Sequence, residues 1–77
     1  MSKLPVTSAK ELEKLLLKQG FQIIRQKGSH RFYKHTDGRY TTLPHHSGED
    51  LTRPLIRVIL RQIDIDTETY TRMLNEK

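Results

Sequence analysis

The chain has 77 residues and no cysteine, so it is short enough for one domain with a thin core and has neither disulfides nor a thiolate metal site. Its net charge of +5 favours an anionic partner. No apolar run approaches the ~20 residues of a membrane span, and no secretory signal begins the chain, so we expect a cytoplasmic protein without membrane association. We expect residues 1–77 to form that one domain.

Residues 8–20 predict the first helix. Ser8 is a typical N-cap residue, and Glu11, three positions later, completes a capping box. An apolar stripe at helical spacing follows, formed by Leu12, Leu15 and Leu16. Gly20 stands where a left-handed residue commonly ends a helix.

Residues 21–27, 30–35 and 40–43 predict strands, because they are rich in aromatic and β-branched residues and are separated by turn residues. Gly28-Ser29 is typical of a tight turn, and Asp37-Gly38 favours a hairpin. Two short connections in succession predict an antiparallel meander in which the strands follow chain order.

A second helix is predicted from Arg53-Pro54, since proline is tolerated in a first helical turn. Its apolar stripe consists of Ile56, Ile59, Leu60 and Ile63. Asp66 is expected to cap a short third helix anchored by Tyr70, Met73 and Leu74. The fold class is therefore α+β: an α-β-β-β-α order with a three-stranded antiparallel sheet, helices on one face and a short C-terminal helix. The other face of the sheet would be free to bind.

The positive charge is concentrated in residues 25–39. Arg25, Lys27, Arg31, Lys34 and Arg39 are opposed there only by Asp37. These bases are interleaved with Phe32 and Tyr33. Such a pattern favours a phosphate-binding surface over an ordinary solvated basic face.

Gly28-Ser29-His30, preceded by Lys27, brings an imidazole, an ammonium group, a hydroxyl and backbone N–H donors together. This combination suits phosphodiester cleavage, in which a base activates a hydroxyl while cations stabilise the developing charge. The alternative is an ordinary hairpin turn followed by a surface histidine. The residues alone leave both interpretations open.

The remaining histidines are His35, at a predicted strand end, and the adjacent pair His45-His46 in a loop. Adjacent side chains point apart, and metal ligands more often occur at helical or turn spacing, so we expect no metal site and no cofactor. His46 is a candidate for a second acid or base, or else a turn residue.

Five ordered motifs resemble the HicA toxin family, small mRNA interferases of toxin–antitoxin modules, over nearly the whole chain. The first is Leu4-Pro5 with the capped helix from Ser8, and the second is Gly20-Phe21 followed by Arg25-Gln26-Lys27 and Gly28-Ser29-His30. The other three are His35 to Arg39, Pro44 to Gly48, and Ile56 to Gln62. Two residue pairs depart from the usual pattern: Pro54-Leu55 replaces a common Gly-Thr, and Ile63-Asp64 replaces Ala-Gly, so Asp64 would adopt a left-handed conformation.

This resemblance implies a double-stranded-RNA-binding-domain-like fold and a metal-independent endoribonuclease with His30 as its catalytic acid or base. The expected partners are mRNA and a HicB-type antitoxin that covers the site. The expected RNA contacts are Arg25, Lys27, Gly28, Ser29, Arg31 and Lys34.

Two other functions remain as alternatives. One is a non-catalytic RNA-binding module, although such modules usually carry a lysine cluster where this chain has Thr52-Arg53-Pro54. The other is an inactive protein-interaction remnant that still binds an antitoxin.

Overall fold

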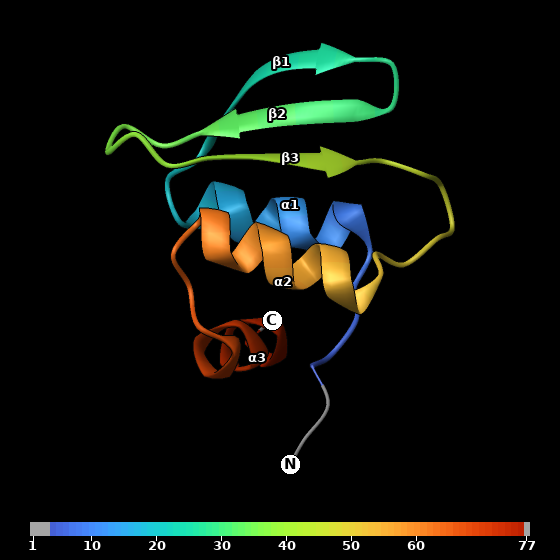
Figure 1. Ribbon diagram of the computed structural model, residues 1–77, viewed down its shortest axis with the longest axis vertical. Helices are drawn as coiled ribbons and strands as arrows, with labels where there is room; N and C mark the ends of the chain where they lie inside the picture. Colours follow the sequence, from blue (N-terminus) through green and yellow to red (C-terminus); the bar gives the residue numbers. More distant parts are fainter. Residues whose placement is uncertain (1–3, 77) are drawn as a thin grey trace.

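The computed structural model describes residues 4–76 (Figure 1). Its elements are α1 (Ala9–Lys18), β1 (Gln22–Lys27), β2 (His30–Lys34), β3 (Tyr40–Pro44), α2 (Arg53–Gln62) and α3 (Thr67–Asn75). This order confirms the predicted α+β fold with its short C-terminal helix. Within the described part of the chain, no helix is long and apolar enough to cross a membrane.

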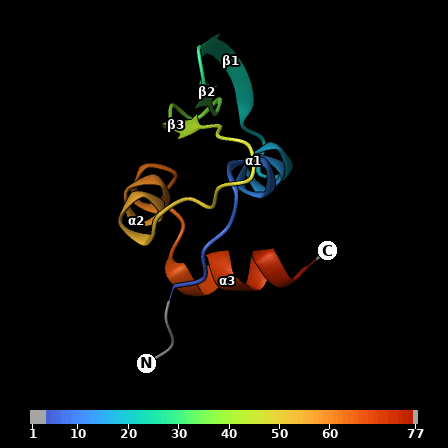
Figure 2. The same cartoon turned by 90° about the vertical axis from the view of Figure 1, so that its right-hand side faces the viewer.

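The strands form an antiparallel sheet in the order β1-β2-β3. Tyr33 of β2 pairs with Thr41 of β3, so their side chains share one face. The Tyr33 hydroxyl bonds to Glu13 of α1 at 2.5 Å, and the Thr41 hydroxyl bonds to Gln62 of α2 at 2.7 Å. Both long helices therefore contact the same face of the sheet, as predicted. Figure 2 shows α1 and α2 below the strands, nearer to β3 than to β1.

The core lies between this face and the helices. It contains the predicted stripes of both helices together with Phe21, Tyr33, Leu43, Leu51 and Tyr70. α3 covers the end of the core that is farthest from the sheet (Figure 2). There the buried Tyr70 donates its hydroxyl hydrogen to the Pro5 carbonyl at 2.7 Å. Burial raises the pKa of Tyr70 to about 12.

The predicted helix ends are confirmed by local hydrogen bonds. The Ser8 hydroxyl accepts from the Glu11 N–H at 3.2 Å, and the Asp66 carboxylate accepts from the Thr69 N–H at 2.7 Å. Thr52 occupies the N-cap of α2 without a side-chain capping bond. Asp64 follows α2 with a φ of 58°, the left-handed conformation that its position required.

β1 differs from the other strands because all six of its residues are exposed. Its pairing with β2 shifts between Ile23, opposite Tyr33, and Arg25, opposite Phe32. Ile24 is the extra residue of this β-bulge and is 51% exposed. The bulge reverses the alternation of the strand, so that Arg25 and Lys27 lie on the face away from the helices.

Candidate active site on the open face of the sheet

The face of the sheet away from α1 and α2 is called the open face here. Strand alternation and the observed register place nine residues on it. They are Gln22, Arg25, Lys27, His30, Phe32, Lys34, Tyr40, Thr42 and Pro44. The open face therefore includes the predicted catalytic residue and three of the predicted cationic RNA contacts.

His30 begins β2 at one end of the open face, opposite Lys27 on one side and Pro44 on the other. It is exposed, and its side chain makes no hydrogen bond or ion pair to another described residue. The ammonium group of Lys27 is therefore on a strand directly adjacent to an accessible imidazole. This arrangement can position a phosphate next to a proton-transfer group.

The turn before His30 leaves the backbone accessible. Gly28 has a φ of 59°, and an added Cβ there would meet nothing within 4 Å. The carbonyl of Ser29 accepts a hydrogen bond from the backbone N–H of His45 at 2.6 Å. This bond ties the turn to the loop that follows β3, so the two predicted RNA contacts in the turn are held beside His30.

Cations and aromatic rings share the middle of the open face. The guanidinium carbon of Arg25 lies 5.2 Å from the centroid of the Phe32 ring. The ring centroids of Phe32 and Tyr40 are 6.2 Å apart. Lys34 is paired with Tyr40, and none of the described residues on this face carries a carboxylate. The electrostatic character of the open face is therefore basic throughout.

Arg31, another predicted RNA contact, lies on the opposite face of the sheet. Its guanidinium donates to Glu13 Oε1 at 2.8 Å and to Gln26 Oε1 at 3.1 Å. Tyr33, which the sequence placed among the interleaved aromatics, is also on that face and is fully buried. Strand alternation thus divides the basic segment between two faces and separates Arg31 from His30.

Glu13, Tyr33 and His45 form a polar network on the helix-covered face of the sheet. This network was not predicted from the sequence. Burial by itself would raise the pKa of Glu13, but hydrogen bonds from Tyr33 and Arg31 and the nearby positive charge lower it. Burial, followed by the hydrogen bond to Glu13, raises the pKa of Tyr33. Because the phenol gives its one hydrogen to the Glu13 carboxylate, we infer that His45 Nε2 donates to the Tyr33 oxygen, 2.9 Å away.

His45 thus has two attachments, its backbone to the turn before His30 and its imidazole to Tyr33. Burial and then the charge of Arg31 lower the pKa of His45, against the opposing effect of Glu13. No sequence signal indicated this network, since Glu13 stands beside the apolar stripe of α1 in a position typical of a solvated residue.

His35 and Arg39 stabilise the second hairpin rather than the open face. The His35 ring packs edge-on against Phe21, with centroids 5.1 Å apart, and its Nε2 bonds to the Gln19 carbonyl at 3.1 Å. Arg39 donates to the Ile63 carbonyl at 2.5 Å and lies 5.0 Å from the Phe21 ring centroid. The charge of Arg39 is paired with Asp37 of the same hairpin at 2.9 Å, and its guanidinium also joins the hairpin to the end of α2.

His46 lines a shallow cleft of about 430 Å³ between the loop after β3 and the start of α2. Pro44, the cross-strand neighbour of His30, lines the same cleft. The cleft thus adjoins the end of the open face, with Glu49 and Asp50 also on its wall. Over residues 4–76, no three histidine or acidic side chains are grouped so that they could hold a metal ion.

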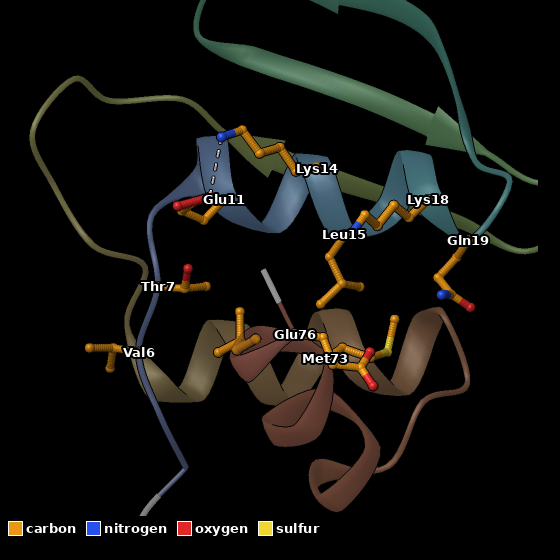
Figure 3. Close-up of a pocket in the computed structure, with 10 residues that line it drawn as sticks. Val6, Thr7, Glu11, Lys14, Leu15, Lys18, Gln19, Met73 and Glu76 are labelled. Carbon is orange, nitrogen blue, oxygen red and sulfur yellow. Dashed lines mark ion pairs between the residues drawn. The ribbon is translucent and has the colours of Figure 1, made fainter.

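A larger cleft of about 470 Å³ lies elsewhere, between α1, α3 and the segment before α1 (Figure 3). Apolar side chains such as Leu15 and Met73 line it together with charges of both signs, including Lys14 and Glu76. It lies on the helix side of the molecule and is separated from His30 by the sheet. Its size alone does not make it the active site.

The family model described as HicA toxin of bacterial toxin–antitoxin matches residues 9–65, about three quarters of the chain. The chain belongs to the HicA toxin family. The match runs from the first residue of α1 to just beyond α2 and includes every residue of the open face. α3 lies beyond the matched residues. No match was found among curated proteins.

Proposed function

We propose that this HicA-family toxin is a metal-independent endoribonuclease that cleaves mRNA with His30 as its catalytic acid or base. The observation that carries the proposal is the exposed imidazole of His30 next to Lys27 on a basic face. In the proposed step, His30 removes the proton of a ribose 2′-hydroxyl. The 2′-oxygen then forms a bond to the adjacent phosphorus while the bond from phosphorus to the 5′-oxygen breaks.

The cations of the open face have defined roles in this proposal. Lys27, and beside it Arg25, would hold the phosphate whose negative charge increases in the transition state. The accessible backbone at Gly28 and Ser29 would contact the same phosphate, and Lys34 would bind the RNA backbone further along β2. His46 is the candidate acid for the leaving 5′-oxygen. Arg31 has no place in the phosphate site, because it is bonded to Glu13 on the other face.

Replacing His30 tests the catalytic assignment. His30→Ala should lower the rate of cleavage of a single-stranded RNA by roughly 10²–10⁴-fold. His35→Ala is the matched control, since that imidazole packs on Phe21 away from the open face. Urea unfolding of each variant separates lost chemistry from lost folding, and cleavage should persist in excess chelator. A His30→Ala variant that cleaves at the wild-type rate would disprove the assignment.

The proposed function includes a HicB-type antitoxin that covers the open face with an acidic surface. Opposite charges would accelerate association, and salt would slow it by screening them. Lys27→Ala should therefore reduce both the association rate and its dependence on ionic strength. Lys10→Ala, an exposed lysine of α1 on the helix side, should change neither. An association rate independent of salt would contradict masking by an acidic partner.

A non-catalytic module of the double-stranded-RNA-binding type is less well supported. Such modules grip phosphates with cations at the start of the helix that follows the three strands, which here is α2. Here Arg53, in the first turn of α2, instead donates to the Leu4 carbonyl at 2.7 Å. Binding of duplex RNA without any cleavage would nevertheless favour this alternative.

A further inference from the structure

Two aromatic side chains of the open face have no role in the chemistry proposed above. Of the chain's five aromatic residues, Phe21, Tyr33 and Tyr70 are buried in the core. The other two, Phe32 and Tyr40, are neighbours on the open face, with ring centroids 6.2 Å apart and planes inclined by 40°. Tyr40 is 44% exposed, although a chain this short has little apolar surface to spare from its core.

The surroundings of these rings match the chemistry of a nucleotide. Cations flank the pair on both sides: Arg25 lies over Phe32, and Lys34 is the cross-strand partner of Tyr40. Phe32 follows His30 by two residues on β2, which places it roughly 7 Å further along the strand. A nucleic-acid strand whose phosphate lay at Lys27 and His30 would therefore run toward Phe32 and Tyr40. Tyr40 presents an exposed ring, whereas the partly buried Phe32 ring is covered by Arg25. A base would reach Phe32 once Arg25 turns to the phosphate, the role given to it above.

We propose that Phe32 and Tyr40 form a stacking platform for unpaired bases of RNA, adjacent to the phosphate site at His30. The inference rests on the proposed function and adds the two side chains that would hold the bases of its unpaired substrate strand. Bases in a duplex already stack on one another and cannot lie flat on a protein ring, whereas unpaired bases can. The lack of any described carboxylate on this face favours RNA over a cationic partner.

Cross-strand contact between Phe32 and Tyr40 could also serve only to stabilise the sheet. Leucine would preserve most of that apolar contact but would remove the flat ring that stacking requires. Tyr40→Phe would keep the ring and lose only the hydroxyl. These substitutions therefore separate base stacking from sheet packing.

The test measures binding of a fluorescent single-stranded RNA of about ten nucleotides by proteins carrying His30→Ala, so that the probe is not cut. Phe32→Leu and Tyr40→Leu should each weaken binding by roughly 5–150-fold, as expected for the loss of one stacked base. Tyr40→Phe should bind normally. Val58→Ala, which alters an exposed residue of α2, is the control and should also bind normally.

A second probe with the same sugar–phosphate chain but no bases isolates the stacking contribution. The leucine variants and their parent should bind this abasic strand equally, whereas Lys34→Ala should weaken binding of both strands. Equal loss on both strands for the leucine variants, or no loss on either, would overturn the platform. Leucine variants that bind RNA normally but lose an antitoxin would assign the rings to a protein interface and also overturn it.

The same experiment distinguishes failure of the platform from failure of the proposed function. RNA that is cleaved by the wild type and bound normally by the leucine variants would refute the platform alone. A parent protein that binds neither strand would refute both the platform and the proposed RNA substrate.

Discussion

Replacing Tyr33 with phenylalanine should destabilise the protein more than the same change at Tyr70. Both side chains are fully buried, so each substitution removes one hydroxyl from a closed environment. The Tyr70 hydroxyl bonds to a neutral carbonyl, and its loss should cost about 1 kcal/mol. The Tyr33 hydroxyl bonds to the Glu13 carboxylate and also accepts from His45, so its loss should cost about 2–3 kcal/mol.

The two penalties should also differ in their pH dependence. Glu13 has a lowered pKa in the folded protein, so its interactions stabilise the fold above its ordinary pKa of 4.5. That stabilisation disappears as the pH falls through the folded-state pKa. Without the Tyr33 hydroxyl this pKa should rise toward its ordinary value. The penalty of Tyr33→Phe should therefore be complete at neutral pH and shrink below pH 4.5.

Urea unfolding of the wild type and both variants over a series of pH values measures these free energies directly. Tyr70→Phe should give the same penalty throughout, because no carboxylate is involved. Equal penalties for the two variants at neutral pH would refute the charge-assisted network. A penalty for Tyr33→Phe that does not change with pH would refute its dependence on ionised Glu13.

Three further effects should appear in the same unfolding assay. Because the pKa of His45 is lowered in the folded protein, the free energy of unfolding of the wild type should begin to fall below pH 6.5. His45→Gln should flatten this decline, and an identical slope of unfolding free energy against pH would contradict the role of His45. Ser8→Ala should cost about 1 kcal/mol, whereas Thr52→Ala, which removes no capping bond, should cost less than about 0.5 kcal/mol. Asp64→Gly should stabilise the protein by about 0.5 kcal/mol because glycine adopts positive φ without strain, and a loss of stability would contradict this.

The sequence was sufficient to predict the elements of the fold because the signals for them are local. The cap at Ser8, the helical stripes and the turn at Asp37-Gly38 each depend on residues a few positions apart. The apolar stripe of α2 also predicted where this helix packs, because Ile56 and Ile59 could be buried only against the sheet. The hydrogen bonds from the paired residues Tyr33 and Thr41 to α1 and α2 confirm that both helices pack on one face of the sheet.

The prediction of the site was less complete because it depends on strand register. His30 and Lys27 were expected together and are cross-strand neighbours. Arg31 was expected with them, but alternation turns it toward α1, where it bonds to Glu13. The bulge at Ile24, which brings Arg25 to the open face, has no turn residue or glycine to indicate it. The catalytic role of His30 stays a prediction.

Strand register therefore determines which positively charged side chains can contact an anionic ligand. Arg31 and Lys27 contribute equally to the net charge, yet the guanidinium of Arg31 is neutralised by Glu13, while Lys27 has no ion pair with another described residue. Without the bulge, Arg25 and Lys27 would point toward the helix side with Arg31, and the open face would lose the cations beside His30. One extra residue in β1 thus separates a charge that stabilises the fold from the charges that surround the proposed phosphate site.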